Sequence, residues 1–447
     1  MTSRRTALAL VLVASLVAGE AAAQRRDYGT MYDDALLASR QKEYREVVLW
    51  NLQNVFLPKL TTDERRRLQG LSVDFPLRGP DRELFEYFAD RNGRVTMSVQ
   101  SIRFLADLSL AYAWLNANGY SMETVSDYVS MLKYQDAARF GGRYPDPITA
   151  LRIPPKAADD PRVSTPFEQI LNHSVSFVLL HEMGHVLYQH PGYGPGVSRA
   201  RARENEDQAD RFALEVLRRV GQPVSGLLFF FLSAAHAVPH RADFGSDAEY
   251  QAHLTQTTHP LTSDRVTRLS QYLRENAADY GRLQNNPARA TSVIRWTADA
   301  IDKEVVPVLA DPDQQRLMAR RGVNMTLAGL APRKPGETMA APAPSGPARP
   351  FHGVFDGEMH DGTAALPIRA ALVRRGDRVT GQYSFGAGQG EISGIVEAET
   401  LSFTWQTATD KGRGVLRSTR DGSHVEGTWG YGERNTGGGR WTGTRTR

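Results

Sequence analysis

The residues best suited to chemistry lie at His181-Glu182-Met183-Gly184-His185, which has the form H-E-x-x-H. Residues four apart on a helix share one face, so His181 and His185 can offer two imidazoles to one metal ion. Neutral imidazole suits Zn²⁺, which lowers the pKa of water toward ~7. Glu182 can then take the proton. The pattern predicts one zinc ion per chain with Glu182 as the catalytic base; the alternative is a buried helix with two satisfied histidines.

A second cluster, N-E-D-Q-A-D at 205–210, opens another helix-like segment. Glu206 and Asp210 are four residues apart, so one carboxylate can be the third metal ligand. The other can accept the ring N–H of a ligand histidine and fix its tautomer. Acidic residues are also favoured in a first helical turn without any metal, so a charged helix end is the alternative.

A third segment, T-H-P-L-T-S-D-R at 258–265, places His259 just before a helix start. Ser263 marks that start, and Val266 and Leu269 continue it at helical spacing. Arg265 can position this loop or meet negative charge that develops during a reaction.

Taken in order, the three motifs resemble those of the gluzincin zinc metallopeptidases of the CAAX-prenyl-protease and HtpX type. The likeness is greatest to the soluble periplasmic members that act in outer-membrane protein quality control, and it covers roughly 173–273. Two features depart from that family. The gap between His185 and the third ligand is shorter than in many members, and transmembrane helices and tetratricopeptide repeats are absent.

The resemblance implies a set of roles. His181, His185 and Glu206 would bind zinc, and Asp210 would orient His181. In the similar periplasmic proteases a histidine at the T-H-P position can occupy the open zinc position and hold the enzyme latent. His259 is therefore a candidate switch, and its alternative is a structural histidine that precedes a helix.

Composition narrows the class of protein. The chain has 447 residues, enough for two or three domains, and 41% are hydrophobic. The net charge of +4 comes from interspersed charges, which argues against a nucleic-acid partner. No cysteine is present, so any metal must be held by histidines and carboxylates.

The first residues predict export. Arg4-Arg5 precede an apolar run, 7–18, that is too short to span a bilayer, and Ala21-Ala22-Ala23 give a cleavage site. We expect a signal peptide at 1–23 and a periplasmic or secreted protein with no transmembrane helix in the mature chain. A membrane anchor and twin-arginine export are the alternatives.

The elements that must position the metal ligands form a mainly α, zincin-like (α+β) domain at 24–330. A helical part at 24–160 would precede a catalytic core at 161–280 and packing helices at 281–330. Pro166 lies near the start of the metal helix, and Pro191-Gly192 stops it.

Strands are expected at 71–75 and 95–99. Val95 to Ser98 could be the edge strand onto which an extended substrate pairs. It could equally be a short strand that leads into a helix.

A Pro/Ala linker at 331–350 leads to a different tail, 351–447, in which short strands alternate with glycine-containing turns. We expect a small antiparallel all-β domain, a meander or a closed barrel. Its strands are predicted at 379–385, 391–396, 401–405, 414–418, 425–429 and 440–444. Trp405, Trp429, Tyr431 and Trp441 could line a ligand face or fill the core.

The function that fits best is an exported zinc metalloendopeptidase with a protein or peptide substrate, in cell-envelope quality control and under a histidine switch. A second hypothesis is a periplasmic binding or chaperone-like factor whose protease fold is latent or inactive. A third is a hydrolase of peptidoglycan peptides. The β domain would then meet an envelope protein or the cell wall. The intact Glu182 favours an enzyme, because a structural zinc site needs no base.

Overall fold

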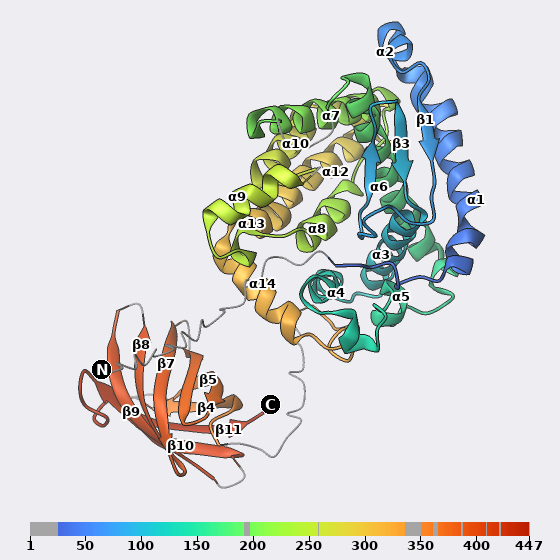
Figure 1. Ribbon diagram of the computed structural model, residues 1–447. Helices are drawn as coiled ribbons and strands as arrows, with labels where there is room; N and C mark the ends of the chain where they lie inside the picture. The colour runs from blue at the N-terminus through green and yellow to red at the C-terminus, as the bar shows by residue number, and fades with distance from the viewer. Residues whose placement is uncertain are drawn as a thin grey trace, which may run out of the picture. The chain divides into compact units, whose positions relative to one another are not determined.

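The computed structural model describes residues 26–191, 197–257, 259–335, 350–360, 365–385, 388–407, 409–419 and 422–446. It divides into two compact units, Met1–Glu337 and Thr338–Arg447 (Figure 1). The predicted signal peptide and residues 336–349 of the predicted linker lie outside the described residues. No described helix has the length and apolar character needed to cross a membrane.

The first unit is mainly helical, as predicted (Figure 1). Its α-helices are α1 (Asp34–Asn51), α2 (Thr62–Arg67), α3 (Val99–Ala117), α4 (Glu123–Tyr134), α5 (Pro147–Ala150), α6 (Pro161–Leu187), α7 (Arg199–Val220), α8 (Leu227–Ala237), α9 (Asp247–Gln256), α10 (Ser263–Glu275), α11 (Ala277–Tyr280), α12 (Pro287–Ala300), α13 (Val306–Ala310) and α14 (Pro312–Asn324). Short 3₁₀ or π segments lie at Leu52–Phe56, Leu57–Lys59, Ala137–Phe140, Ala157–Asp159, Arg241–Asp243 and Ile301–Val305.

The long helix α6 carries the H-E-x-x-H motif. Asp160 caps it by accepting a hydrogen bond from the Arg162 N–H at 2.9 Å, and Pro161 occupies the first turn, where its missing N–H is not needed. The helix stops at Leu187, earlier than Pro191, because Gln189 turns the chain with a φ of 54°. Helices α3, α7 and α8 pack against α6, so the motif lies in the interior.

A small sheet accompanies the helices. It holds β1 (Ser72–Asp74), β2 (Tyr87–Ala89) and β3 (Arg94–Met97) in the order β1-β3-β2. Strand β3 pairs parallel with β1 and antiparallel with β2. Val95 to Ser98 is therefore not a free edge strand, because hydrogen bonds occupy both sides of β3. Of the two alternatives, the short strand that leads into a helix is the one found, since α3 follows β3. Strand β2, which was not predicted and packs on α6, lies at the edge.

The second unit is an eight-stranded antiparallel barrel, closed by pairing of its first and last strands (Figure 1). The strands are β4 (Gly353–His360), β5 (Ala365–Arg375), β6 (Arg378–Phe385), β7 (Gly388–Glu397), β8 (Thr400–Thr407), β9 (Lys411–Ser418), β10 (His424–Tyr431) and β11 (Gly439–Arg445). The all-β prediction is confirmed and its barrel alternative is the one found. Strands β4 and β5 were not among the predicted strands, because Asp356, Gly357 and Pro367 have low strand propensity.

Candidate metal centre

The three motif residues of α6 are buried side by side. His181, Glu182 and His185 are exposed by only 5%, 2% and 7%. Gly184 lets α7 approach this face, since a Cβ atom at Gly184 would lie 2.8 Å from the Cα of Ala209. The small residue between the ligands is thus what brings the acidic residues of α7 to the histidines.

The donor atoms of four side chains meet at one place. The Nε2 atoms of His181 and His185 are 3.0 Å apart, and the Glu206 carboxylate lies 3.5 Å and 3.4 Å from them. His259 completes the group, and one donor atom from each residue lies within 4.8 Å of all the others. Two donors that share a zinc ion at about 2.0–2.1 Å each lie about 3.3 Å apart, so this group fits such an ion.

The chemistry of the donors fits a divalent cation as well. Burial by itself would raise the pKa of Glu206, but Arg265 and the neighbouring histidines outweigh burial and hold that pKa well below its usual value. Burial likewise would lower the pKa of His181, yet Asp210 and Glu206 raise it to about 10. The carboxylates therefore stay ionised and attract positive charge to the His181 ring. Two imidazoles and a carboxylate are the donors that zinc prefers.

Asp210 and Arg265 form a frame behind the donors. Asp210 Oδ1 lies 2.8 Å from His181 Nδ1, the atom that faces away from Glu206. Arg265 is buried and binds Asp210 with two N–H groups at 2.7 Å each, while its Nη1 lies 2.5 Å from Glu206 Oε2. Because both carboxylates engage the guanidinium, this geometry favours a positioning role for Arg265 over contact with developing charge.

His259 lies between the base and the third ligand. Its Nδ1 is 3.3 Å from Glu206 Oε1 and 3.4 Å from His181 Nε2, and its Nε2 is 3.6 Å from Glu182 Oε1. The side chain is 24% exposed, more than any other member of the group. It is the ligand-type residue nearest to solvent.

Glu182 carries a buried oxygen without a partner. Its Oε2 is buried and has no hydrogen-bond partner among the described residues. A buried oxygen left without a donor destabilises the folded state by roughly 1–3 kcal/mol, and by more when the group is charged.

His190 is a further residue of the centre that was not predicted. Its Nδ1 lies 2.9 Å from His185 Nδ1, and its Nε2 lies 2.9 Å from Gln208 Oε1. If His185 presents Nε2 to a metal, its Nδ1–H can donate to His190, which in turn donates to Gln208. The spacing from His185 is not helical, so only the left-handed turn at Gln189 brings this ring back.

The comparison with protein families finds one related family over this part of the chain. Residues 121–283 match the family Peptidase U49. The matched segment holds all of the residues described above, so a peptidase-type segment coincides with a His/Glu group able to hold a metal ion. Comparisons with curated proteins and with solved structures gave no match.

Proposed function

We propose that the first unit is a zinc-dependent metalloendopeptidase of the gluzincin type. The observation that carries this proposal is the convergence of His181, His185 and Glu206 beside a buried Glu182 whose Oε2 lacks a partner among the described residues. The similarity of residues 121–283 to Peptidase U49 supports the same class of reaction.

Each residue then has one task. His181, His185 and Glu206 hold Zn²⁺, which when bound supplies a Lewis acid that polarises the scissile carbonyl and lowers the pKa of water toward ~7. Glu182 takes the proton of the attacking water and returns it to the leaving amine. Asp210 fixes the tautomer of His181, so that its Nε2 carries the lone pair.

His259 is proposed as the switch. In the position found here it offers a fourth donor and lies against Glu182, where a substrate carbonyl would have to enter. Displacement of this one side chain would open the site. Its greater exposure supports a residue that can move without unpacking the core.

The finer assignments rest on the sequence. The three ordered motifs favour the CAAX-prenyl-protease and HtpX type, and residues 4–23 favour an exported protein. We accordingly propose unfolded or misassembled proteins of the cell envelope as substrates.

The test is zinc content together with cleavage of unfolded casein by the purified full chain. Wild type should hold one zinc ion. Glu182→Gln should keep the zinc and lose activity by roughly 10²–10⁴-fold, since it removes only the base. Glu206→Gln should lose zinc, and His259→Ala should keep zinc and cleave faster. His360→Ala, which removes an exposed histidine of the barrel, is the matched control.

Two results would contradict the proposal in different ways. Absence of bound zinc in every preparation would refute the metal centre itself. Bound zinc with no cleavage by wild type or by His259→Ala would instead favour the binding or chaperone-like factor.

A further inference from the structure

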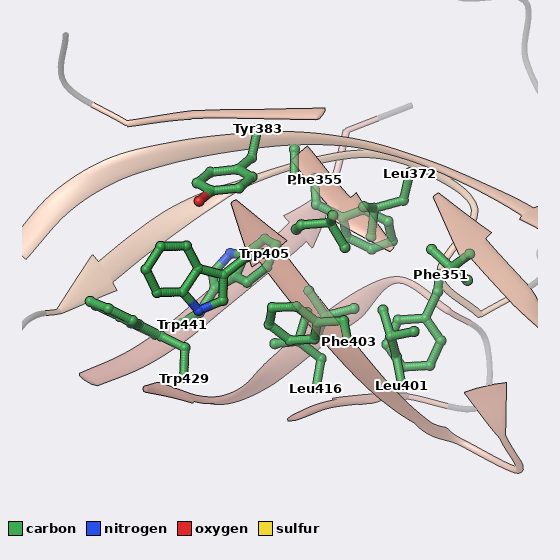
Figure 2. Packing of buried hydrophobic residues seen from close by; sticks show 14 of the residues in the cluster. Phe351, Phe355, Leu372, Tyr383, Leu401, Phe403, Trp405, Leu416, Trp429 and Trp441 are labelled. Carbon is green, nitrogen blue, oxygen red and sulfur yellow. The ribbon is translucent and has the colours of Figure 1, made fainter. Parts of the chain in front are cut away.

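The interior of the barrel is filled at one end and hollow at the other. Figure 2 shows Phe351, Leu401 and Leu416 gathered on one side, and these three side chains are fully buried. Trp405, Trp429 and Trp441 lie on the other side, where they line a cavity of about 640 Å³. A volume of this size is within the range of sites that hold drug-sized molecules.

Glycines keep this cavity open. Trp405 pairs across the strands with Gly412, and Tyr383 pairs with Gly390. A Cβ atom at Gly412 would lie 2.6 Å from the Trp405 ring, and one at Gly390 would lie 2.5 Å from the Tyr383 ring. The rings therefore lie over the glycines of the neighbouring strands, against the wall. A residue with a side chain at these positions would push them into the centre.

The charges around the cavity favour an uncharged occupant. Among the described residues that line it, Asp410 is the only carboxylate, and no lysine or arginine is present. An anionic headgroup would find no described lysine or arginine in the lining and one carboxylate. A cation is disfavoured for another reason. The Trp405, Trp429 and Tyr431 rings pack edge to face with centroids 5.4–5.6 Å apart, too close to enclose an ammonium group among them.

The indole N–H groups of the wall are not open to the cavity. Trp405 Nε1 donates to the carbonyl of Gly430 at 3.1 Å. The Nε1 atoms of Trp429 and Trp441 are buried, with almost no surface of their own. The three indoles therefore meet an occupant with the carbon atoms of their rings.

We propose that the barrel is a binding site for an uncharged, mainly apolar small molecule. Its apolar body contacts the aromatic wall. This site belongs to the second unit and does not depend on the peptidase proposal.

The test is fluorescence titration of the full chain with two naphthalene probes of similar size. Prodan is uncharged and carries a ketone, whereas anilinonaphthalene sulfonate is anionic. We expect saturable binding of one prodan per chain, with energy transfer from tryptophan, and binding of the sulfonate at least tenfold weaker.

Two variants of strand β5 provide the matched comparison. Leu366→Arg places a cation in the lining, and it should weaken prodan at least tenfold and strengthen the sulfonate. Val373→Arg adds the same charge to an exposed position of that strand and should change neither. Tyr431→Arg places the cation at a lining position that is 56% exposed, should have the same two effects, and provides the test if Leu366→Arg does not fold.

The proposal would be overturned by non-saturable binding of prodan to wild type. Equal prodan affinity in Leu366→Arg and Val373→Arg, or tighter binding of the sulfonate than of prodan by wild type, would also overturn it.

Discussion

Charge balance governs the residues of the metal centre. Glu182, Glu206 and Asp210 bring three carboxylates into the interior, and Arg265 is the cation that binds two of them. Uncompensated charge in a buried site is strongly unfavourable, so a divalent cation at the four donors would stabilise the folded state as well as enable chemistry. Metal removal should therefore loosen this region.

His190 should matter for metal affinity although it offers no donor atom to the ion. Its contact at 2.9 Å fixes the ring of His185, and loss of such a partner typically lowers affinity by 10–100-fold. We expect this loss in His190→Ala, measured by competition with a chromophoric zinc chelator. His190→Asn, whose side-chain oxygen can replace Nδ1 as the acceptor, should stay close to wild type. Wild-type affinity in His190→Ala would show that His185 holds its orientation unaided.

Helix packing sets the distance between the two halves of the metal site. Helix α6 provides the histidines and α7 the carboxylates, and the two helices touch where Gly184 faces Ala209. Interaxial distance depends on the side chains at such a contact. Donor spacing is therefore controlled by a residue that never touches the metal.

Gly184→Ala should separate the two helices and weaken zinc binding by at least tenfold. The added methyl carbon would lie 2.8 Å from the Cα and 3.2 Å from the Cβ of Ala209, a backbone clash that no side-chain rotation relieves. Zinc affinity and the thermal midpoint of the helical signal measure the effect. Adding Ala209→Gly removes the contact with the Cβ of Ala209, so the double variant should recover part of the loss. Unchanged zinc affinity in Gly184→Ala alone would mean that the two helices can accommodate the methyl group without changing the donor spacing.

The sequence could predict which donor residues lie together only where two of them are four residues apart on one helix. The pair His181 and His185 follows from an interval of four, and so does the pair Glu206 and Asp210, because each stays within one helix. His190 could not be found in this way, since a left-handed residue places it. The central position of β3 also escaped prediction, because a strand's neighbours are set by tertiary pairing that no local pattern contains.

Figure 1 shows two units with different architectures. Each has its own buried core. The helical unit holds several partly or fully buried histidines in neutral form. His173 accepts the Gly226 N–H at 3.1 Å, and burial lowers its pKa from 6.5 to about 4. Acid should therefore weaken this unit as the pH falls below about 6.5.

The sign of that effect follows from linkage. Between pH ~4 and 6.5 the unfolded chain binds a proton at His173 that the folded chain does not, so stability is full above pH 6.5 and falls as pH drops. His173 alone should lower the free energy of unfolding by about 2 kcal/mol between pH 7.5 and pH 5. Urea unfolding at the two pH values, followed by circular dichroism at 222 nm, measures this difference.

His173→Asn can keep the acceptor for Gly226 without the titration, so its stability should fall less on acidification. His360→Asn, at an exposed histidine, should behave as wild type. A pH dependence that is identical in His173→Asn and wild type would contradict this account.

Closure of the barrel has a consequence for synthesis of the chain. Strand β4 begins at Gly353, yet its second neighbour is β11, Gly439–Arg445. During translation the hydrogen-bonding edge of β4 therefore stays open until β11 has left the ribosome, and late pairings of this kind are slow and prone to association between chains. A stop codon just before Gly439 would leave the edges of β4 and β10 unpaired. Such truncated chains should be degraded by proteases or aggregate, even though the helical unit is already synthesised and can fold before the barrel.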